Sequence, residues 1–391
     1  MKELTILMPC LNEAETIGKC IERAKKLLSE YNIDGEILVA DNGSTDGSQE
    51  IAKSLGARVV HCPIRGYGAA IMCGIEHAEG KFILLGDSDD SYHFDEAFPL
   101  IEKLREGYDV CMGTRLKGKI MPGAMPWLNR WIGNPILTAI GKFLFKINIS
   151  DFHCGMRAFR KDKILALNLV TTGMEWASEM IIKAKLAGLK ITEVPITYYK
   201  AGRSRPPHLR RWRDGWRHLR FMLLHSPFWL FIVPGIIMTL IGFIGMVALI
   251  PGPIIIKGNI GFDVHTLLVM AFLTILGFQT IFVGFFAKIY AHNSGILPYN
   301  DRLFKIIKRF SLEELLIASL LIGVIGVAGV IWSVYGWYEV GFKELNYQIT
   351  MRKLVPSLVL VAISLQGIFN SFMFSILMLD VKPIKKNQTQ G

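Results

Sequence analysis

Four long apolar stretches in the later part of the chain place the strongest constraint on its fold. Each has roughly 20 or more largely apolar residues, enough to cross ~30 Å of hydrocarbon as an α-helix. They predict transmembrane helices at 228–250, 266–290, 315–338 and 354–379. The hydrophobic content of 51% and the mean hydropathy of +0.36 therefore reflect a soluble part followed by a membrane part, because the apolar residues gather after Ser226.

The 391 residues accordingly divide into three predicted regions, an α/β domain at 1–205, an interfacial basic segment at 206–226 and a transmembrane domain at 227–391. In the basic segment, arginines alternate with Trp212, Trp216 and other apolar residues, which predicts an amphipathic helix at the bilayer surface. Its arginines can reach phosphate, or they can anchor the next span on the cytosolic side. The two interpretations are compatible.

The placement of cations predicts the topology. The loop at 291–311 is rich in lysine and arginine, and an even number of crossings returns the chain to its starting side. Because no signal peptide precedes the first predicted strand, we expect a multi-pass protein of the cytoplasmic membrane whose catalytic domain and termini are cytosolic.

Charge and cysteine content exclude other classes. The net charge of +11 comes without a basic motif with interleaved stacking aromatics, so we expect a bilayer or an anionic lipid as partner and no nucleic acid. No C-x-x-C pair or zinc-finger spacing is present, which predicts six reduced, mostly buried thiols at Cys10, Cys20, Cys62, Cys73, Cys111 and Cys154.

In the first region, short apolar runs alternate with helical periodicity. The pattern predicts a mostly parallel sheet covered by helices on both faces, with a last edge strand at 191–194. The other strands are expected at 4–8, 36–40, 58–61, 81–86 and 109–112. Helices are expected at 48–55, with Ser44 as N-cap, at 94–105, at 127–145 along the membrane surface and at 175–187.

The strand at 81–86 ends in Asp87-Ser88-Asp89-Asp90, which delivers carboxylates to the carboxyl edge of the sheet. Acids this close repel one another unless a cation lies among them. Oxygen ligands one residue apart suit Mg²⁺ or Mn²⁺ holding a diphosphate, so Asp87 and Asp89 are the candidate metal ligands. The alternative is an acidic turn followed by a capped helix.

Two other motifs keep two interpretations each. Asp41, at the end of its strand, suits a nucleotide base or ribose, or it belongs to an Asp-Asn-Gly turn. Gly66-x-Gly68 lacks the third glycine of a dinucleotide fingerprint, and it either lets a backbone approach a nucleotide or begins a helix. Arg130 and Asn134 are four residues apart and are expected on one helix face.

In combination, these motifs resemble the family 2 glycosyltransferases of GT-A fold. The motifs that carry the resemblance are Pro9-Cys10-Leu11-Asn12-Glu13, 40–47, Gly66-x-Gly68-x-Ala70, Asp87-Ser88-Asp89 and Gly113-Thr114-Arg115. More narrowly, Asp151-x-x-Cys154-Gly155-x-Arg157 and the trailing membrane helices resemble the polyprenyl- and dolichyl-phosphate sugar synthases, in the branch once labelled dolichyl-phosphate-glucose synthetase-like.

The resemblance implies a nucleotide-sugar donor of UDP-glucose or GDP-mannose type and a polyprenyl or dolichyl phosphate acceptor. It implies that Pro9, Asn12, Glu13 and Asp41 hold the nucleotide, with Asp87 and Asp89 at the metal and diphosphate. Asn42 and Ser91 depart from the family pattern, and Asp90 is an alternative third metal ligand. The implied contacts of the acceptor phosphate are Arg115 and Arg130, to which charge and position add Arg203, Arg205 and Asn134.

The chemistry agrees with this assignment, because a lipid phosphate is already anionic and needs little or no general base. We therefore expect a single displacement with inversion at C1, with Asp89, Arg115 and Arg130 as catalytic residues. A processive polysaccharide synthase and a non-catalytic nucleotide-binding membrane protein are the alternatives. The first would need a base for a hydroxyl acceptor, and no Glu-Asp pair is found around 175–179. Oligomeric state stays open, with a homo-oligomer as one outcome.

Overall fold

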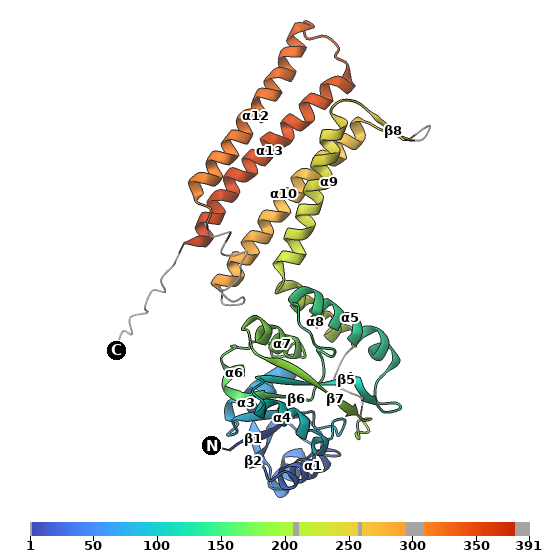
Figure 1. Cartoon of the computed structure of the whole chain (residues 1–391), viewed down its shortest axis with the longest axis vertical. Helices are drawn as coiled ribbons and strands as arrows, with labels where there is room; N and C mark the ends of the chain where they lie inside the picture. Colours follow the sequence, from blue (N-terminus) through green and yellow to red (C-terminus); the bar gives the residue numbers. More distant parts are fainter. Residues whose placement is uncertain (1, 206–210, 257–259, 295–305, 307–308, 380–391) are drawn as a thin grey trace, which may run out of the picture. The chain divides into compact units, whose positions relative to one another are not determined.

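The computed structural model describes residues 2–205, 211–256, 260–294, 306 and 309–379. The chain forms two compact units, Met1–Leu224 and His225–Gly391, each described by itself. The first holds the sheet and the second holds the long apolar helices (Figure 1). The three-region division, with 206–226 as a separate segment, stays a prediction. Residues 206–210 of that segment lie outside the described residues.

A seven-stranded sheet forms the centre of the first unit, in the order β3-β2-β1-β4-β6-β5-β7. Only β6 runs antiparallel to its neighbours, so the predicted mostly parallel sheet is confirmed. The edge position predicted for the last strand is also confirmed. The strands are β1 (Leu4–Cys10), β2 (Gly35–Asp41), β3 (Arg58–His61), β4 (Phe82–Leu85), β5 (Val110–Ile120), β6 (Arg157–Arg160) and β7 (Ile191–Tyr198).

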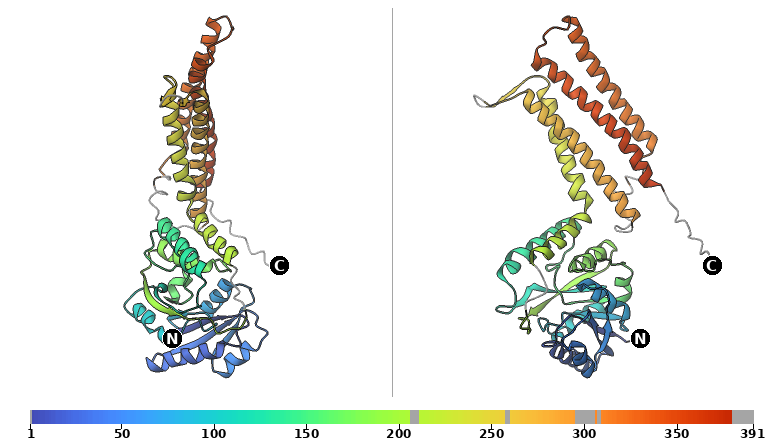
Figure 2. Two further views of the ribbon diagram at one scale, coloured as in Figure 1. Left: turned by 90° about the vertical axis from the view of Figure 1, so that its right-hand side faces the viewer. Right: turned by 180° about the vertical axis from the view of Figure 1, so that it is seen from behind.

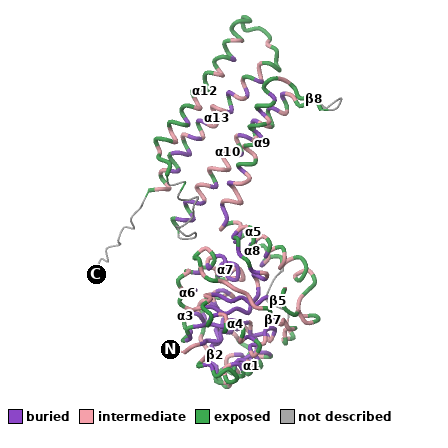
Figure 3. Tube along the Cα trace, in the orientation of Figure 1, coloured by how far each residue is buried: buried purple, intermediate pink, exposed green. Residues whose placement is uncertain are grey.

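Helices cover both faces of this sheet and bury its apolar side chains, as the purple interior of Figure 3 shows. One face packs against α1 (Ile17–Glu30) and α4 (Phe98–Arg105), and the other against α3 (Tyr67–His77) and α7 (Trp176–Leu186). The remaining helices are α2 (Ser48–Ser54), η1 (Phe94–Glu96), η2 (Asn129–Gly133), α5 (Asn134–Phe145), α6 (Lys161–Leu165) and α8 (Arg211–Leu224).

Two local predictions are wrong. The helix expected at 94–105 is divided at Ala97 into η1 and α4, and Pro99 lies in the first turn of α4, where its missing N–H costs nothing. Ser44 does not cap α2. Gly47 precedes that helix with a φ of +90°, a left-handed conformation that glycine adopts without steric cost.

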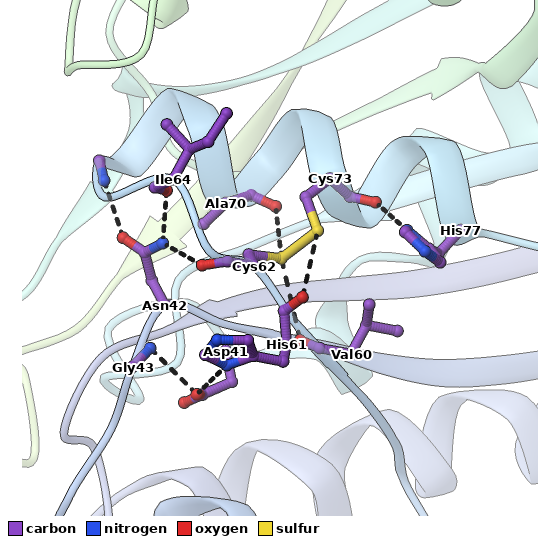
Figure 4. The surroundings of a disulfide bond; sticks show 11 residues. Asp41, Asn42, Gly43, Val60, His61, Cys62, Ile64, Ala70, Cys73 and His77 are labelled. Carbon is purple, nitrogen blue, oxygen red and sulfur yellow. Dashed lines mark hydrogen bonds and ion pairs between the residues drawn. A yellow bond between two sulfur atoms is a disulfide. The ribbon is translucent and has the colours of Figure 1, made fainter.

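The prediction of six reduced thiols is wrong for two of them, because Cys62 and Cys73 form a disulfide (Figure 4). Cys62 follows β3 and Cys73 lies on α3, which brings their Cα atoms within 6.0 Å across 11 residues of sequence. A spacing of this length carries no pairing signal of its own. The other four cysteines are free and buried.

Among its described residues, the second unit contains four helices long and apolar enough to cross a membrane, as predicted. The candidate spans are Phe228–Leu249 (η3, Phe228–Ile232, with α9, Val233–Leu249), α10 (Val264–Asn293), α12 (Leu312–Glu339) and α13 (Tyr347–Met378). A short hairpin, β8 (Ile254–Ile256) and β9 (Ile260–Phe262), connects α9 to α10.

Small residues let the last two helices approach closely along their length (Figures 1 and 2). A Cβ on Gly326 of α12 would lie 2.8 Å from the backbone nitrogen of Val361 on α13, and one on Gly323 would lie 2.4 Å from Ser364 Oγ. Contacts of this kind are the usual basis of helix association in lipid, where apolar burial gives no net drive. The large apolar side chains that remain exposed on these helices suit a hydrocarbon environment.

Candidate active site

Three parallel strands, β1, β2 and β4, end at one edge of the sheet, and predicted site residues stand at each end. Asn12 and Glu13 follow β1, Asp41 is the last residue of β2, and Asp87 follows β4. The carboxyl edge of such a sheet is the usual place for a ligand. Motifs widely separated in sequence are therefore neighbours in the fold.

The loop after β1 is fastened to the loop after β2. Asn12 has a φ of +57°, a left-handed conformation that asparagine tolerates. Its backbone N–H donates to Ser44 Oγ (2.9 Å), and its side-chain oxygen accepts from the Thr45 N–H (2.8 Å). The Glu13 N–H donates to Ser48 Oγ (2.9 Å). Ser44 is thus a partner of the β1 loop.

The Asp41 carboxylate is fully buried and holds its own turn. It accepts from the backbone N–H groups of Gly43 (3.0 Å) and Ser44 (3.2 Å) and from Gln49 Nε2 (2.8 Å). These contacts match the turn interpretation of Asp41, and its part in nucleotide binding stays a prediction.

The side-chain amide of Asn42 holds the loop after β3 (Figure 4). Its Nδ2 donates to the carbonyl oxygens of Cys62 (3.0 Å) and Ile64 (2.7 Å), and its Oδ1 accepts from the Gly66 N–H (2.8 Å). An aspartate could accept here but could not donate. The departure from the family pattern at this position therefore has a structural reason.

The two acids after β4 lie in different surroundings. The partly buried Asp87 accepts a hydrogen bond at Oδ1 from the Tyr67 hydroxyl (2.9 Å). Burial, and then the charge of Asp89, raises the pKa of Asp87 to about 6. Asp89 is buried and accepts from the backbone N–H (3.0 Å) and the hydroxyl of Ser91. The neighbouring Asp90 pairs with Arg23 Nε of α1 (2.9 Å).

Arg203 and Arg205 join the acids of two loops. Arg203 contacts Glu13 Oε1 (2.8 Å) and Asp89 Oδ2 (3.1 Å), and Arg205 contacts Glu13 Oε1 (2.6 Å) and the carbonyl oxygens of Leu11 and Asn12 (both 2.9 Å). Burial raises the pKa of Glu13, although both arginines oppose the shift. Four predicted site residues thus form one charged cluster, Glu13, Asp89, Arg203 and Arg205.

Arg115, on β5, forms a buried bidentate ion pair with Asp151. Its Nε lies 2.7 Å from Asp151 Oδ2 and its Nη2 lies 2.9 Å from Oδ1. The guanidinium also lies over the Tyr198 ring and within 3.4 Å of the Tyr92 hydroxyl. Burial opposes ionisation of Asp151, but the charge and hydrogen bonds of Arg115 lower its pKa below the ordinary value. Part of the Arg115 charge is therefore neutralised within the protein.

Arg130 and Asn134 lie on η2 and at the start of α5, and no hydrogen bond or ion pair among the described residues joins them to the charged cluster. Arg130 is exposed, with its guanidinium 5.2 Å from the Trp131 ring centroid. Trp127 and Trp131 are 67% and 61% exposed, which suits the predicted interfacial position.

Several contributors to the site were missing from the sequence-based set. Tyr67 donates to Asp87, and the Tyr92 hydroxyl lies beside Arg115, yet neither tyrosine was chosen as a site residue. The Arg115–Asp151 pair spans 36 residues, which no local spacing reveals. For Tyr67 one signal existed, its position between two glycines that follow a strand.

The chemistry of the donor set fits a divalent cation. Asp87 and Asp89 present hard oxygen ligands, and burial and then the charge of Asp89 oppose ionisation of Asp87, an effect that a cation would offset. Among the described residues, no group of three or more His, Cys, Asp or Glu side chains could hold a metal. Two carboxylates with water and phosphate oxygens are a usual ligand set for Mg²⁺.

The carboxylate of Glu179, on α7 in the segment where a polysaccharide synthase would need its base, is held by the protein itself. Both Glu179 oxygens accept hydrogen bonds, from the Val170 and Thr171 N–H groups, and its carboxylate pairs with Lys183 (2.8 Å). Glu175, the residue before α7, has a buried Oε2 with no hydrogen-bond partner in the described part of the chain. Glu179 is thus committed to holding the 170–171 loop.

Comparison with known families identifies two regions. Residues 5–166 match glycosyl transferase family 2, and residues 285–378 match the glycosyltransferase family 2 C-terminal transmembrane region. A crystal structure of glucosyl-3-phosphoglycerate synthase from Mycobacterium tuberculosis, in complex with Mn²⁺ and UDP-glucose, has a TM-score of 0.46 and 22% identity, covering 57% of this chain and 79% of that chain. A similarity at this level carries no argument about the present site.

Sequence relatives extend over more of the chain. The low-salt glycan biosynthesis hexosyltransferase Agl6 of Haloferax volcanii is 36% identical over 377 residues, covering 96% of this chain and 89% of the relative. A dolichyl-phosphate hexose transferase from the same organism is 31% identical, over 50% of this chain and 82% of its own. Together with the four apolar helices, these matches show that the chain belongs to glycosyltransferase family 2 and is a multi-pass membrane glycosyltransferase.

Proposed function

We propose that this enzyme transfers a hexose from a nucleotide sugar of UDP-glucose or GDP-mannose type to a polyprenyl or dolichyl phosphate, with inversion at C1. The observation that carries the proposal is the cluster in which Glu13 and Asp89 alternate with Arg203 and Arg205 at the carboxyl edge of the sheet. Such a cluster can receive a cation, a diphosphate and a second anion. The name of the relative that transfers hexose to dolichyl phosphate supports this acceptor class.

The donor would lie along the edge formed by Pro9, Asn12, Glu13 and Asp41. The loops there are pre-formed, because Asn12 and Glu13 are hydrogen-bonded to the β2 loop. A bound Mg²⁺ or Mn²⁺, held by Asp87 and Asp89, would supply charge stabilisation for the departing diphosphate. Arg203 is close enough to Asp89 to exchange that carboxylate for a phosphate oxygen.

The acceptor phosphate would meet Arg115, Arg130, Arg203, Arg205 and Asn134. Asp151 already neutralises part of the charge on Arg115, so we expect this residue to orient the phosphate more than attract it. Exposed Arg130 lies beside tryptophans that suit the bilayer surface, where a lipid phosphate would stand. The catalytic domain and both termini would face the cytosol.

The commitment of Glu179 favours an anionic acceptor. A hydroxyl acceptor must lose a proton in the transition state, whereas a phosphate oxygen can attack directly. Among the described residues, Glu179 is occupied by its own loop and Lys183. This commitment removes Glu179 as the base that a processive polysaccharide synthase, the alternative, would need.

The test is transfer by the purified full-length protein from radiolabelled nucleotide sugars, with Mn²⁺, to polyprenyl phosphate and, separately, to polyprenol. We expect a lipid-linked monosaccharide of inverted configuration with the phosphate alone. Asp89→Asn is expected to abolish metal-dependent transfer in a folded protein. Polymer formation, or transfer to polyprenol at an equal rate, would contradict the proposal.

A further inference from the structure

The Gly66-Tyr67-Gly68 motif is packed against a distant segment of the chain. A Cβ on Gly66 would lie 2.2 Å from the Thr172 carbonyl oxygen, and one on Gly68 would lie 2.5 Å from that of Thr171. The Ala69 N–H also donates to the Thr172 carbonyl (3.2 Å). The two glycines therefore serve a close backbone contact that fixes the start of α3.

Between these glycines, Tyr67 contacts a candidate metal ligand. Its hydroxyl donates to Asp87 Oδ1 (2.9 Å) across 20 residues of sequence. A backbone-anchored donor thus holds one oxygen of the carboxylate.

The other oxygen of Asp87 lies against Gly155. A Cβ at this position would lie 2.6 Å from Asp87 Oδ2 and 2.9 Å from the Tyr92 ring. The Gly155 N–H donates to the Tyr92 hydroxyl (2.9 Å), and Arg157 Nη2 donates to the Cys154 carbonyl (2.6 Å). Buried neighbours therefore fix the 154–155 backbone beside the carboxylate.

We propose that Tyr67 and Gly155 are positioning residues that set the orientation in which Asp87 meets the divalent cation. Tyr67 holds Oδ1 by its hydrogen bond, and Gly155 leaves the space that Oδ2 occupies. Groups that orient a ligating carboxylate commonly change metal affinity 10–100-fold when they are removed. The inference rests on the proposed function, because it takes Asp87 and Asp89 as metal ligands.

The first test measures Mn²⁺ binding to the full-length protein by the loss of the electron paramagnetic resonance signal of free Mn²⁺. The specific site is the binding component that Asp89→Asn removes. Tyr67→Phe is expected to weaken this component about tenfold or more. Its unfolding temperature should stay near that of the wild type, because only the hydroxyl is lost. At saturating Mn²⁺, the Tyr67→Phe enzyme should transfer hexose at most of the wild-type rate. The substitution should therefore change the apparent Kd for Mn²⁺ more than kcat.

Tyr199→Phe is the matched control. The Tyr199 hydroxyl also donates to a carboxylate, Glu96 Oε1 (2.6 Å), but neither residue is a candidate metal ligand. Its Mn²⁺ affinity should equal that of the wild type. Equal affinity in Tyr67→Phe as well would overturn the proposed role of Tyr67.

Gly155→Ala tests the second contact independently. The new methyl group would meet Asp87 Oδ2 and the Tyr92 ring, so the Asp87 carboxylate must leave its present orientation to make room. We expect weaker Mn²⁺ binding, again about tenfold or more. Gly215→Ala is the control, because a Cβ on this α8 glycine would have nothing within 4 Å. Wild-type affinity in Gly155→Ala would overturn the part assigned to Gly155.

The outcomes separate the inference from the function on which it rests. If the wild type has no Mn²⁺ component that Asp89→Asn removes, the metal site of the proposed function fails, and the inference fails with it. If that component exists and neither Tyr67→Phe nor Gly155→Ala alters it, the metal site stands and only the inference fails.

Discussion

At the scale of single residues, buried pairing decides what several predicted site residues do. Arg115 was predicted as a contact of the acceptor phosphate, and the structure joins it to Asp151 by two hydrogen bonds of 2.7 and 2.9 Å. Both side chains are almost fully buried. Removing one partner of such a pair leaves an uncompensated charge in the interior, which costs more than the pair itself contributes.

Asp151→Asn is therefore expected to lower the free energy of unfolding by about 3–5 kcal/mol. Chemical denaturation of the purified protein, followed by tryptophan fluorescence, measures the change. The control is Asp162→Asn, which removes the partner of Arg160 at the surface and should cost at most about 1 kcal/mol. Equal effects of the two substitutions would show that the Arg115–Asp151 pair is not the buried anchor described above.

A second prediction concerns Asn42, which donates two hydrogen bonds and accepts one. Asn42→Asp turns the donors into a carboxylate oxygen facing two carbonyl oxygens, so we expect a loss of about 1–3 kcal/mol. Amide hydrogen exchange should rise in the loop after β3, because the carbonyl oxygens of Cys62 and Ile64 lose their donors. Unchanged exchange in this loop would contradict this role.

At the scale of elements, the segment after β7 lies against the loop after β4, which carries the candidate metal ligands Asp87 and Asp89. The Tyr199 N–H donates to the Ser91 carbonyl (3.0 Å) and the Gly202 N–H to that of Asp89 (2.9 Å). These bonds bring Arg203 within 3.1 Å of Asp89 Oδ2. A guanidinium thus neutralises a carboxylate that we propose as a metal ligand.

Arg203→Gln is expected to tighten Mn²⁺ binding in the absence of nucleotide. Two unit charges 4 Å apart interact by about 1 kcal/mol even in water, so removal of the arginine should lower the Kd roughly fivefold or more. This sign is opposite to that expected for Tyr67→Phe, and the same resonance titration measures both. Weaker Mn²⁺ binding in Arg203→Gln would show that the arginine supports the cation instead of competing with it.

The contact between α7 and α8 predicts a pH dependence. Ser178 Oγ lies 2.9 Å from His218 Nδ1 and 3.2 Å from His153 Nε2. Burial lowers the pKa of His218 from 6.5 to about 4; the charge of Asp214 opposes this decrease, and the smaller effect of Arg157 adds to it. The unfolded state then binds the proton more readily, so the stability that neutral His218 contributes is complete above pH 6.5 and is lost as the pH falls toward 4.

Amide exchange in α7 and α8 should therefore be faster, relative to the intrinsic rates, at pH 5 than at pH 7.5. Mass spectrometry of the full-length protein at both values, corrected for the intrinsic pH effect, tests this. His218→Gln is expected to reduce the difference. The same pH dependence in His218→Gln would assign it to another group.

At the scale of the whole molecule, the sequence was sufficient for the elements with strong periodicity or length. The four spans, the parallel core strands and the edge strand β7 were all predicted. Strand β6 was not, because Arg157–Arg160 has only four residues and two of them are arginines. It pairs antiparallel between β4 and β5, a contact set by tertiary packing.

The candidate site likewise has one part that the sequence predicts and one part that it does not. Residues at strand ends, such as Asp87 and Asp89, follow from the motif and the rule that ligands bind at the carboxyl edge. The contacts within the site do not, because Tyr67 reaches Asp87, Arg203 reaches Asp89 and Asp151 reaches Arg115 across long stretches of sequence. Conformations that depend on packing, such as the close approach of Gly155 to Asp87, likewise have no local signal.

The proposed topology predicts a labelling pattern. Cysteines introduced at exposed Pro253 and Glu344, in the two connections predicted to face outward, should react with an impermeant maleimide in intact cells. A cysteine at exposed Lys53 should react only after lysis. The reverse pattern would place the catalytic unit outside.

Because of the Cys62–Cys73 disulfide, the result of an experiment on this enzyme depends on whether the buffer contains a reductant. A bond closing a loop of 11 residues restricts the unfolded chain by about 3 kcal/mol, and it lies beside the Asn42 contacts that shape the nucleotide edge. Dithiothreitol in a purification would produce a less stable preparation. Two laboratories whose protocols differ only in reductant would be comparing chemically distinct proteins.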